Sequence, residues 1–127
     1  MINLDFYCMQ YGQKLGMRKE GKSKEKKQHE NNIRDALAVL TEDGVYAMFV
    51  WLESKKLSEI RVGLRELMSD AEIKKYLLNG KNLGEEFDEF CENLQEIARD
   101  LDKLLFLKKI LERTLTYALY HAKTEAG

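Results

Sequence analysis

Residues 85–122 read EEFDEFCENLQEIARDLDKLLFLKKILERTLTYALYHA, a stretch without glycine or proline. Its apolar residues recur at the spacing that places them on one face of a helix. Two heptad series run along that face: Leu94, Leu101, Leu115 and Ala122, interrupted by Lys108, with Ile97, Leu104, Leu111 and Ala118 between them. A continuous helix of this length would span about 57 Å, whereas a compact chain of this size has a radius of gyration of about 14 Å. The unbroken period favours a bent but continuous helix, and the size favours a break near residues 100–103.

The composition of the whole chain extends this helical interpretation. The 127 residues include eight glycines and no proline, and 44% of them are hydrophobic. That is enough apolar material for one core and too much for a disordered chain. A chain with few helix-breaking residues favours helices over short strands and tight turns. We therefore expect one all-α domain over residues 1–127, a small helical bundle of about five to six helices with a long C-terminal helix.

Residues 20–31, EGKSKEKKQHEN, contain no apolar side chain. A segment with nothing to bury is expected to form a polar, basic loop or a solvated helix extension. Asn31 or Asn32 can then cap the helix that follows.

Residues 45–52, VYAMFVWL, are apolar at almost every position. Gly44 provides a turn before them, and the neighbouring segments are helical, so a lone strand here would lack a partner. We expect this segment to be the most buried helix, with Phe49 and Trp51 largely out of water.

The chain lacks the motifs of known catalytic and metal sites. His29 and His121, the two histidines, have no second ligand at helical spacing and are expected on the surface. Cys8 and Cys91 fall on apolar helical faces, where cysteine behaves as a small hydrophobic residue. No phosphate-binding, dinucleotide-binding or nucleophile-elbow motif is present. We expect no enzymatic activity, no cofactor and no metal.

Targeting features are also missing from the sequence. No run of about 18 apolar residues exists, so no membrane span is expected. The first residues lack the basic start and apolar stretch of a signal peptide. A cytoplasmic protein is the expectation.

The formal net charge of -1 conceals a strong segregation of charge. Residues 14–27 carry seven basic and two acidic side chains, and residues 85–102 carry eight acidic and one basic side chain. Residues 103–123 are again basic, with five basic side chains and one acidic. Acids early and bases late in a helix also match its macrodipole, so residues 85–123 have a purely structural explanation as well.

Basic side chains that cluster without a base-reading motif suit contacts to nucleic-acid phosphates. The candidate nucleic-acid-binding residues are Lys14, Arg18, Lys19, Lys22, Lys24, Lys26 and Lys27, followed by Lys108, Lys109 and Arg113. Tyr117 and Tyr120, close to Arg113 and Lys123, are weaker candidates for stacking on bases.

The segment LLFLKKIL at residues 104–111 is apolar on more than one side of a helix. Such a segment packs against two neighbours or against another chain. We expect at least one of four side chains to contact a second chain: Leu104, Phe106, Leu107 or Ile110.

Two segments carry a resemblance to a known family. Residues 31–55, NNIRDALAVLTEDGVYAMFVWLESK, and residues 100–123, DLDKLLFLKKILERTLTYALYHAK, resemble the C-terminal helical part of the large subunit of type I-D CRISPR effector complexes. The chain as a whole looks like the small subunit of such complexes. Those small subunits are proline-poor helical bundles of this length, and in several systems they are similar to the C-terminal part of the large subunit.

The resemblance implies a non-catalytic scaffold role. Several copies would stack inside a crRNA-guided complex, contact its larger subunits and the crRNA, and bind the backbones of the target and displaced DNA strands. In such complexes the guide RNA reads sequence and the protein contacts backbone. The pI of about 6.2 departs from the basic character of many nucleic-acid binders. An alternative, favoured by the heptad stripe, is a helical protein–protein adaptor or dimer without a nucleic-acid partner.

Overall fold

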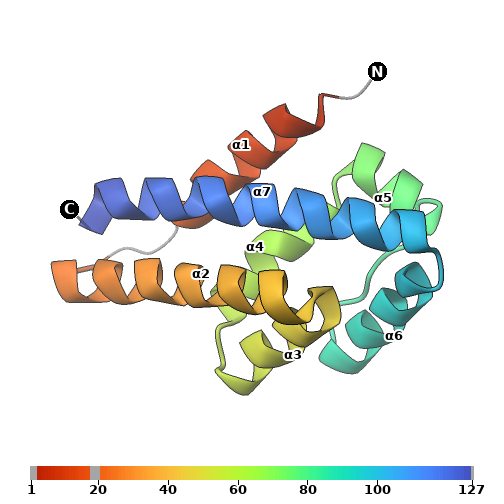
Figure 1. Ribbon diagram of the computed structural model, residues 1–127, viewed down its shortest axis with the longest axis horizontal. Helices are drawn as coiled ribbons and strands as arrows, with labels where there is room; N and C mark the ends of the chain where they lie inside the picture. Colours follow the sequence, from red (N-terminus) through yellow and green to blue (C-terminus); the bar gives the residue numbers. More distant parts are fainter. Residues whose placement is uncertain (1–2, 18–20, 127) are drawn as a thin grey trace.

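The computed structural model of the protein describes residues 3–17 and 21–126, and in this part of the chain the regular secondary structure consists of helices, without strands (Figure 1). This confirms the all-α expectation, with seven helices in the described ranges in place of five to six. They are α1 (Leu4–Gly16), α2 (Ser23–Asp43), α3 (Val45–Ser54), α4 (Ser58–Met68), α5 (Ala71–Leu78), α6 (Phe87–Ala98) and α7 (Leu101–Ala126).

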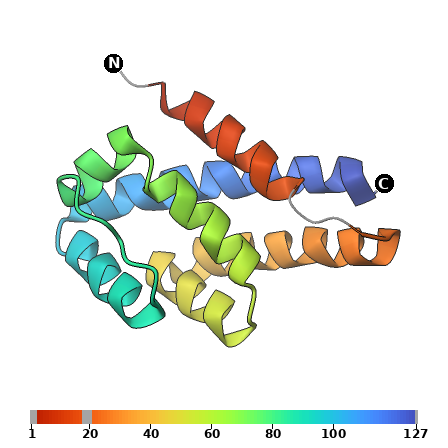
Figure 2. The ribbon, with the colours of Figure 1, turned by 180° about the vertical axis from the view of Figure 1, so that it is seen from behind.

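The long helix α7 organises the bundle. Helix α2 runs beside it in the opposite direction, and α1 crosses it on the other side (Figure 1). Helices α3, α4, α5 and α6 form a group that covers one end of this layer, as the reverse view shows (Figure 2). The buried side chains of these helices form one continuous hydrophobic core.

The stretch 85–122 is two helices, so the expectation of a continuous helix is wrong and the break expected from the size of the molecule is confirmed. Helix α6 ends at Ala98 and α7 begins at Leu101. The Asp100 carboxylate accepts hydrogen bonds from the backbone N–H groups of Asp102 and Lys103, at 3.0 and 3.3 Å, and so caps α7. Leu101, the first residue of α7, has 66% of its surface exposed, although the heptad pattern places it inside.

The polar segment before residue 31 is helical, so the expected loop over residues 20–31 is wrong from Ser23 onward. The alternative of a helix extension holds, and neither Asn31 nor Asn32 is a helix cap. These first turns of α2 are not fully solvated, because His29 and Glu30 are buried. His29 is therefore not a surface residue as expected; its Nε2 lies 3.0 Å from the carbonyl oxygen of Leu15 in α1. The burial of both groups is tolerated because both have polar partners.

Helix α3 is buried on one side rather than all round. Gly44, with φ of 97°, ends α2 and starts α3 in a single residue. Phe49 is fully buried and packs edge-to-face on Phe90 of α6, with ring centroids 4.8 Å apart. Trp51 is only half-buried, which corrects the expectation that it lies largely out of water, and Tyr46 is exposed.

Helix α1 approaches α7 closely because two glycines, Gly12 and Gly16, face it. A Cβ atom on Gly12 would lie 2.6 Å from the Cβ of Tyr117, and one on Gly16 would lie 2.4 Å from the carbonyl oxygen of Ala118. Only the absence of a side chain permits this separation of the two backbones. At the start of α1, the Asn3 side chain caps the helix by accepting from the N–H of Phe6.

Candidate nucleic-acid interface

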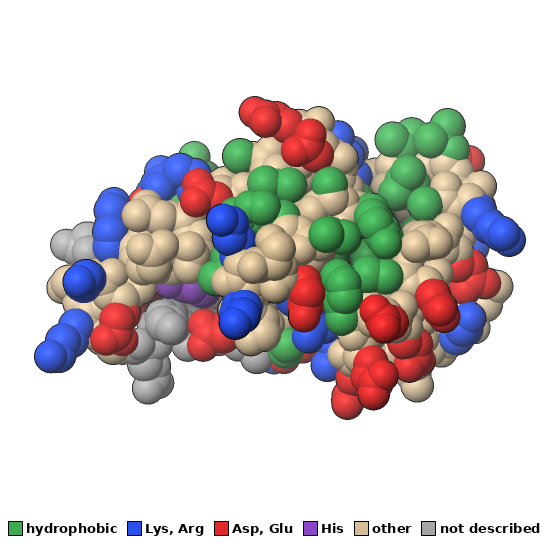
Figure 3. Space-filling view, turned by 90° about the horizontal axis from the view of Figure 1, so that it is seen from below, with side chains coloured by type: hydrophobic (Ala, Val, Ile, Leu, Met, Phe, Trp, Pro, Cys, Tyr) green, Lys and Arg blue, Asp and Glu red, His purple; other side chains and the backbone are tan. Residues whose placement is uncertain are grey.

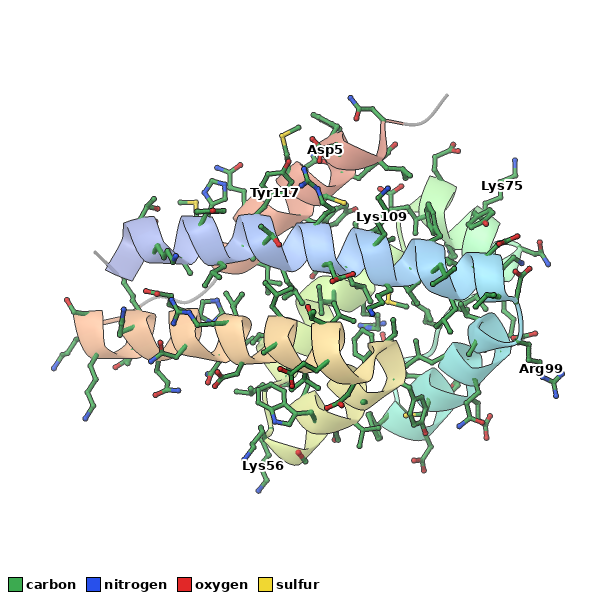
Figure 4. The ribbon with its side chains drawn as sticks, in the orientation of Figure 1. Asp5, Lys56, Lys75, Arg99, Lys109 and Tyr117 are labelled. Atoms are coloured by element: carbon green, nitrogen blue, oxygen red, sulfur yellow. The ribbon has the colours of Figure 1, made fainter. Side chains whose placement is uncertain are left out.

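One end of the molecule gathers cationic side chains from two helices. Helix α2 begins where α7 ends, and the Nζ of Lys26 lies 3.5 Å from a carboxylate oxygen of Glu125 (Figure 1). We call this the basic end and define it by Lys22, Lys24, Lys26, Lys27 and Lys123. In the space-filling view, Lys and Arg side chains dominate this end and Asp and Glu side chains gather toward the other (Figure 3). On the face shown, the segregation seen in the sequence is kept in part, although Lys75 and Arg99 lie at the opposite end (Figure 4).

Lys22 and Lys24 are the most available cations of the basic end. Both are exposed, and within residues 3–17 and 21–126 neither forms an ion pair. Both lie at the N-terminus of α2, where the Lys22 side chain forms no capping hydrogen bond. The helix macrodipole disfavours positive charge at this terminus and favours an anion. The first turn already carries one carboxylate, that of Glu25, and a phosphate placed here would add a second anion beside the two lysines.

Lys26 and Lys27 are occupied by contacts within the chain. Lys26 pairs with Glu125, and the Nζ of Lys27 lies 3.3 Å from the carboxylate of the buried Glu30. Arg34 contacts the other oxygen of Glu30. The hydrogen bond from Arg34, followed by that from Lys27, holds the pKa of Glu30 below its ordinary value of 4.5. Among the described residues, two of these four lysines thus form ion pairs within the chain and two do not.

We predict that Glu30 contributes stability that depends on pH. Because its pKa is lower in the folded state, its contribution is present above pH 4.5 and is lost as the pH falls through the folded-state pKa. The stability difference between the wild type and Glu30→Gln should therefore be larger at pH 7 than at about pH 3. Urea denaturation of both proteins at the two pH values measures this. An equal difference at both values would show that the ion pairs of Glu30 contribute nothing.

Tyr120 and Lys123 complete the basic end from the last turns of α7. Tyr120 is 64% exposed, and the Nζ of Lys123 lies 5.4 Å from the centre of its ring. An exposed aromatic ring beside lysines provides a stacking surface for an unpaired base. Lys123 was not selected from the sequence, because the pairing of the end of α7 with the start of α2 is visible only in three dimensions.

The other predicted cations lie elsewhere or lie outside the described residues. Lys14, on α1, is exposed and 3.8 Å from Glu66, and Arg18 and Lys19 lie outside the described ranges. Lys108 and Lys109 lie in the first half of α7, about 21 to 23 Å along the helix from Lys123.

Arg113 is engaged by α1 and is not a free cation. It donates to the Asp5 carboxylate at 2.7 Å and to the Tyr117 hydroxyl at 2.6 Å, and Tyr117 donates in turn to Asp5 (Figure 4). The hydrogen bonds from Arg113 and Tyr117 lower the pKa of the Asp5 carboxyl. These hydrogen bonds hold α1 against α7. They account for the positive charge of Arg113 without a bound phosphate.

The four candidate interface residues on α7 are largely internal. Leu107 and Ile110 are buried in the chain's own core, at 0% and 3% exposure, so they offer no surface to a second chain. Leu104 and Phe106 are half-buried and pack against the same core. The exposed leucines of α7 are instead Leu101 and Leu105.

Residues 3–17 and 21–126 contain no group of three histidine, cysteine, aspartate or glutamate side chains arranged to hold a metal ion. Cys8 and Cys91 are buried free thiols, and burial raises the pKa of both. Within the same ranges, none of the helices combines the length and the apolar character that a membrane span requires.

Comparison of the chain with protein-family models, curated proteins and solved structures gives no match. The candidate interface therefore rests on the positions of its side chains alone.

Proposed function

We propose that the protein is a non-catalytic subunit that binds nucleic-acid backbone, in the role of the small subunit of a crRNA-guided CRISPR effector complex. The observation that supports this proposal most strongly is that Lys22 and Lys24, at the N-terminus of α2, are exposed and form no ion pair with any other described residue. Lys123 and Tyr120 of α7 add a third cation and an exposed ring at the same end.

The composition of the basic end favours backbone over sequence recognition. Lysine ammonium groups on flexible side chains attract phosphate without fixing the identity of a base. A single tyrosine ring stacks on any base. Binding should therefore vary little among sequences and should depend strongly on salt.

The acidic helix α6, at the other end of the molecule, is also consistent with the proposed role. Its exposed carboxylates would repel a phosphate backbone, so a strand bound at the basic end would be held away from this part of the molecule. In the proposed complex, this end would face other copies of the chain or the larger subunits. The near-neutral net charge is then compatible with a local phosphate-binding surface.

The alternative role is a helical adaptor or dimer without nucleic acid. The exposure of Leu101 and Leu105 on α7 favours a contact with another protein chain. The two roles differ at the basic end, which an adaptor would not need.

The proposed function is tested by replacing the two free lysines. Binding of the full chain to a fluorescent single-stranded DNA or RNA oligonucleotide is measured by anisotropy for the wild type and for Lys22→Ala/Lys24→Ala. We expect the double variant to bind at least about tenfold more weakly at low salt, equally for unrelated sequences. The matched control, Lys55→Ala/Lys75→Ala, removes the same charge from two exposed positions elsewhere, directly after α3 and on α5, and should bind like the wild type. Equal affinities of the two double variants would instead favour the adaptor.

A further inference from the structure

The outward side of α3 is apolar, although it faces water. Its residues Tyr46, Ala47, Val50 and Trp51 have the spacing that places them on one side of a helix. Tyr46 is 43% exposed and Val50 is 40% exposed, and Ala47 and Trp51 are half-buried. We call these four residues the α3 face. Because the water-facing side of a surface helix is usually polar, an apolar side of this kind favours burial against a further chain.

Acidic side chains border the α3 face where it meets α6. The Tyr46 hydroxyl accepts a hydrogen bond from Gln95 of α6 at 3.3 Å, so the α3 face and α6 adjoin. Asp88 and Glu92 lie about two turns and one turn before Gln95 on the same side of α6, and Asp43 ends α2 directly before α3. All three carboxylates are exposed, and within the described part of the chain none forms an ion pair. The space-filling view shows hydrophobic side chains gathered in the middle of this side of the molecule, with Asp and Glu side chains next to them (Figure 3).

The position of these acids selects the charge of a partner. Lys55 and Lys56 follow α3 at the end away from Asp43, so the negative charge lies along α6 and at the start of α3. Phosphates would be repelled there, which disfavours nucleic acid even though Tyr46 and Trp51 carry aromatic rings. Lysine or arginine side chains that approach along α6 would be attracted. Charge complementarity therefore favours a basic protein segment.

The kind of segment follows from the helical surface. The described part of the chain has no strand, so it offers a partner strand no sheet edge to extend. A helix satisfies its own backbone hydrogen bonds and needs only an apolar stripe to pack on another helix. The α3 face presents such a stripe over its outward turns, and the carboxylates of α6 run beside it.

We propose that the α3 face is a docking site for an amphipathic helix of a partner protein, whose apolar stripe covers Val50 and Trp51 and whose basic side chains meet Asp88 and Glu92. This inference goes beyond the proposed function and does not depend on it. The contact needs no nucleic acid, and α3 lies at the opposite end of α2 from the basic end (Figure 1).

The test uses two synthetic helical peptides of about five turns as probes. They share one face of leucine and alanine, contain no tryptophan, and carry lysine at the polar positions in one peptide and glutamate in the other. We expect the full chain to bind the lysine peptide at least about tenfold more tightly than the glutamate peptide at low salt. Trp51 is the single tryptophan of the chain, so its fluorescence reports on the α3 face. Its emission should move to shorter wavelength when the peptide replaces water around the ring.

A substitution within the α3 face tests the apolar contact. Val50→Gln should weaken binding of the lysine peptide at least about fivefold, because it would place an amide without a partner in the centre of the contact. Leu105→Gln makes a comparable change at another exposed apolar residue and should bind the peptide like the wild type. Circular dichroism confirms that both variants are folded.

A charge reversal tests the acidic border. Asp88→Lys/Glu92→Lys should reverse the preference, so that the glutamate peptide binds more tightly than the lysine peptide. The matched control Glu72→Lys/Asp102→Lys makes the same change of charge at exposed positions of α5 and α7. It should keep the preference for the lysine peptide.

Three results would overturn the proposal: equal affinities of the two peptides for the wild type, a Trp51 emission that the lysine peptide leaves unchanged, or Val50→Gln binding like Leu105→Gln. An emission shift caused by an oligonucleotide, or by protein concentration alone, would also overturn it and assign the α3 face to nucleic acid or to a second copy. The variant Lys22→Ala/Lys24→Ala should bind the lysine peptide like the wild type, so failure of the nucleic-acid role and failure of the docking site are distinguishable.

Discussion

Phe49→Ala should lower the free energy of unfolding by about 3–5 kcal/mol, the range for removing a fully buried aromatic ring. Phe49 has no exposed surface and contacts Phe90 edge-to-face across α3 and α6. Its loss would leave a cavity between these helices and also remove the aromatic contact. Chemical denaturation monitored by circular dichroism measures the change.

Trp51→Ala provides the comparison on the same helix. Trp51 has the larger ring, but it is only half-buried, so less apolar surface is returned to water than full burial would imply. We expect a loss smaller than that of Phe49→Ala, about 1–3 kcal/mol. A loss for Trp51→Ala as large as that for Phe49→Ala would contradict the position of α3 in the bundle.

Gly16→Ala should destabilise the protein by about 1–3 kcal/mol, although alanine is the better helix former. The new Cβ would lie 2.4 Å from the Ala118 carbonyl oxygen and 2.8 Å from the Cβ of His121. A backbone oxygen cannot rotate away, so α1 would have to move off α7.

Gln13→Ala is the control for Gly16→Ala, since Gln13 is exposed on the same helix. It should change the stability by less than about 0.5 kcal/mol. A Gly16→Ala protein as stable as the wild type would show that α1 is not held in close contact with α7.

The helical class of the protein could be predicted from its sequence because it follows from composition and periodicity. The inward positions Leu111, Leu115 and Ala118 are buried as their spacing predicts. The exposure of Leu101 could not be predicted from spacing, because it shares a face with the buried Leu115 and is exposed as the first residue of α7, beyond the packed part of the helix. Among the sequence arguments, only the one from molecular size indicated the break before α7.

The candidate site was predictable as a region and not as a set of residues. The density of lysines marked residues 14–27, but a count of charges cannot separate a free lysine from one bound to a buried acid. Lys27 is bound to Glu30, whose burial depends on the packing of α2 against the rest of the bundle. Lys123 joins Lys22 and Lys24 through a contact between segments about a hundred residues apart, which local patterns do not contain.

The charges of the basic end are tested most directly by the salt dependence of single-strand binding. Each lysine that meets a phosphate should lower the logarithm of the affinity by about 0.7 per unit of the logarithm of salt concentration. Contacts from Lys22, Lys24 and Lys123 predict a slope of about -2 for the wild type and about -0.7 for Lys22→Ala/Lys24→Ala. The control Lys55→Ala/Lys75→Ala should keep the wild-type slope. A slope that Lys22→Ala/Lys24→Ala leaves unchanged would contradict the account, because phosphate would then be bound elsewhere on the molecule.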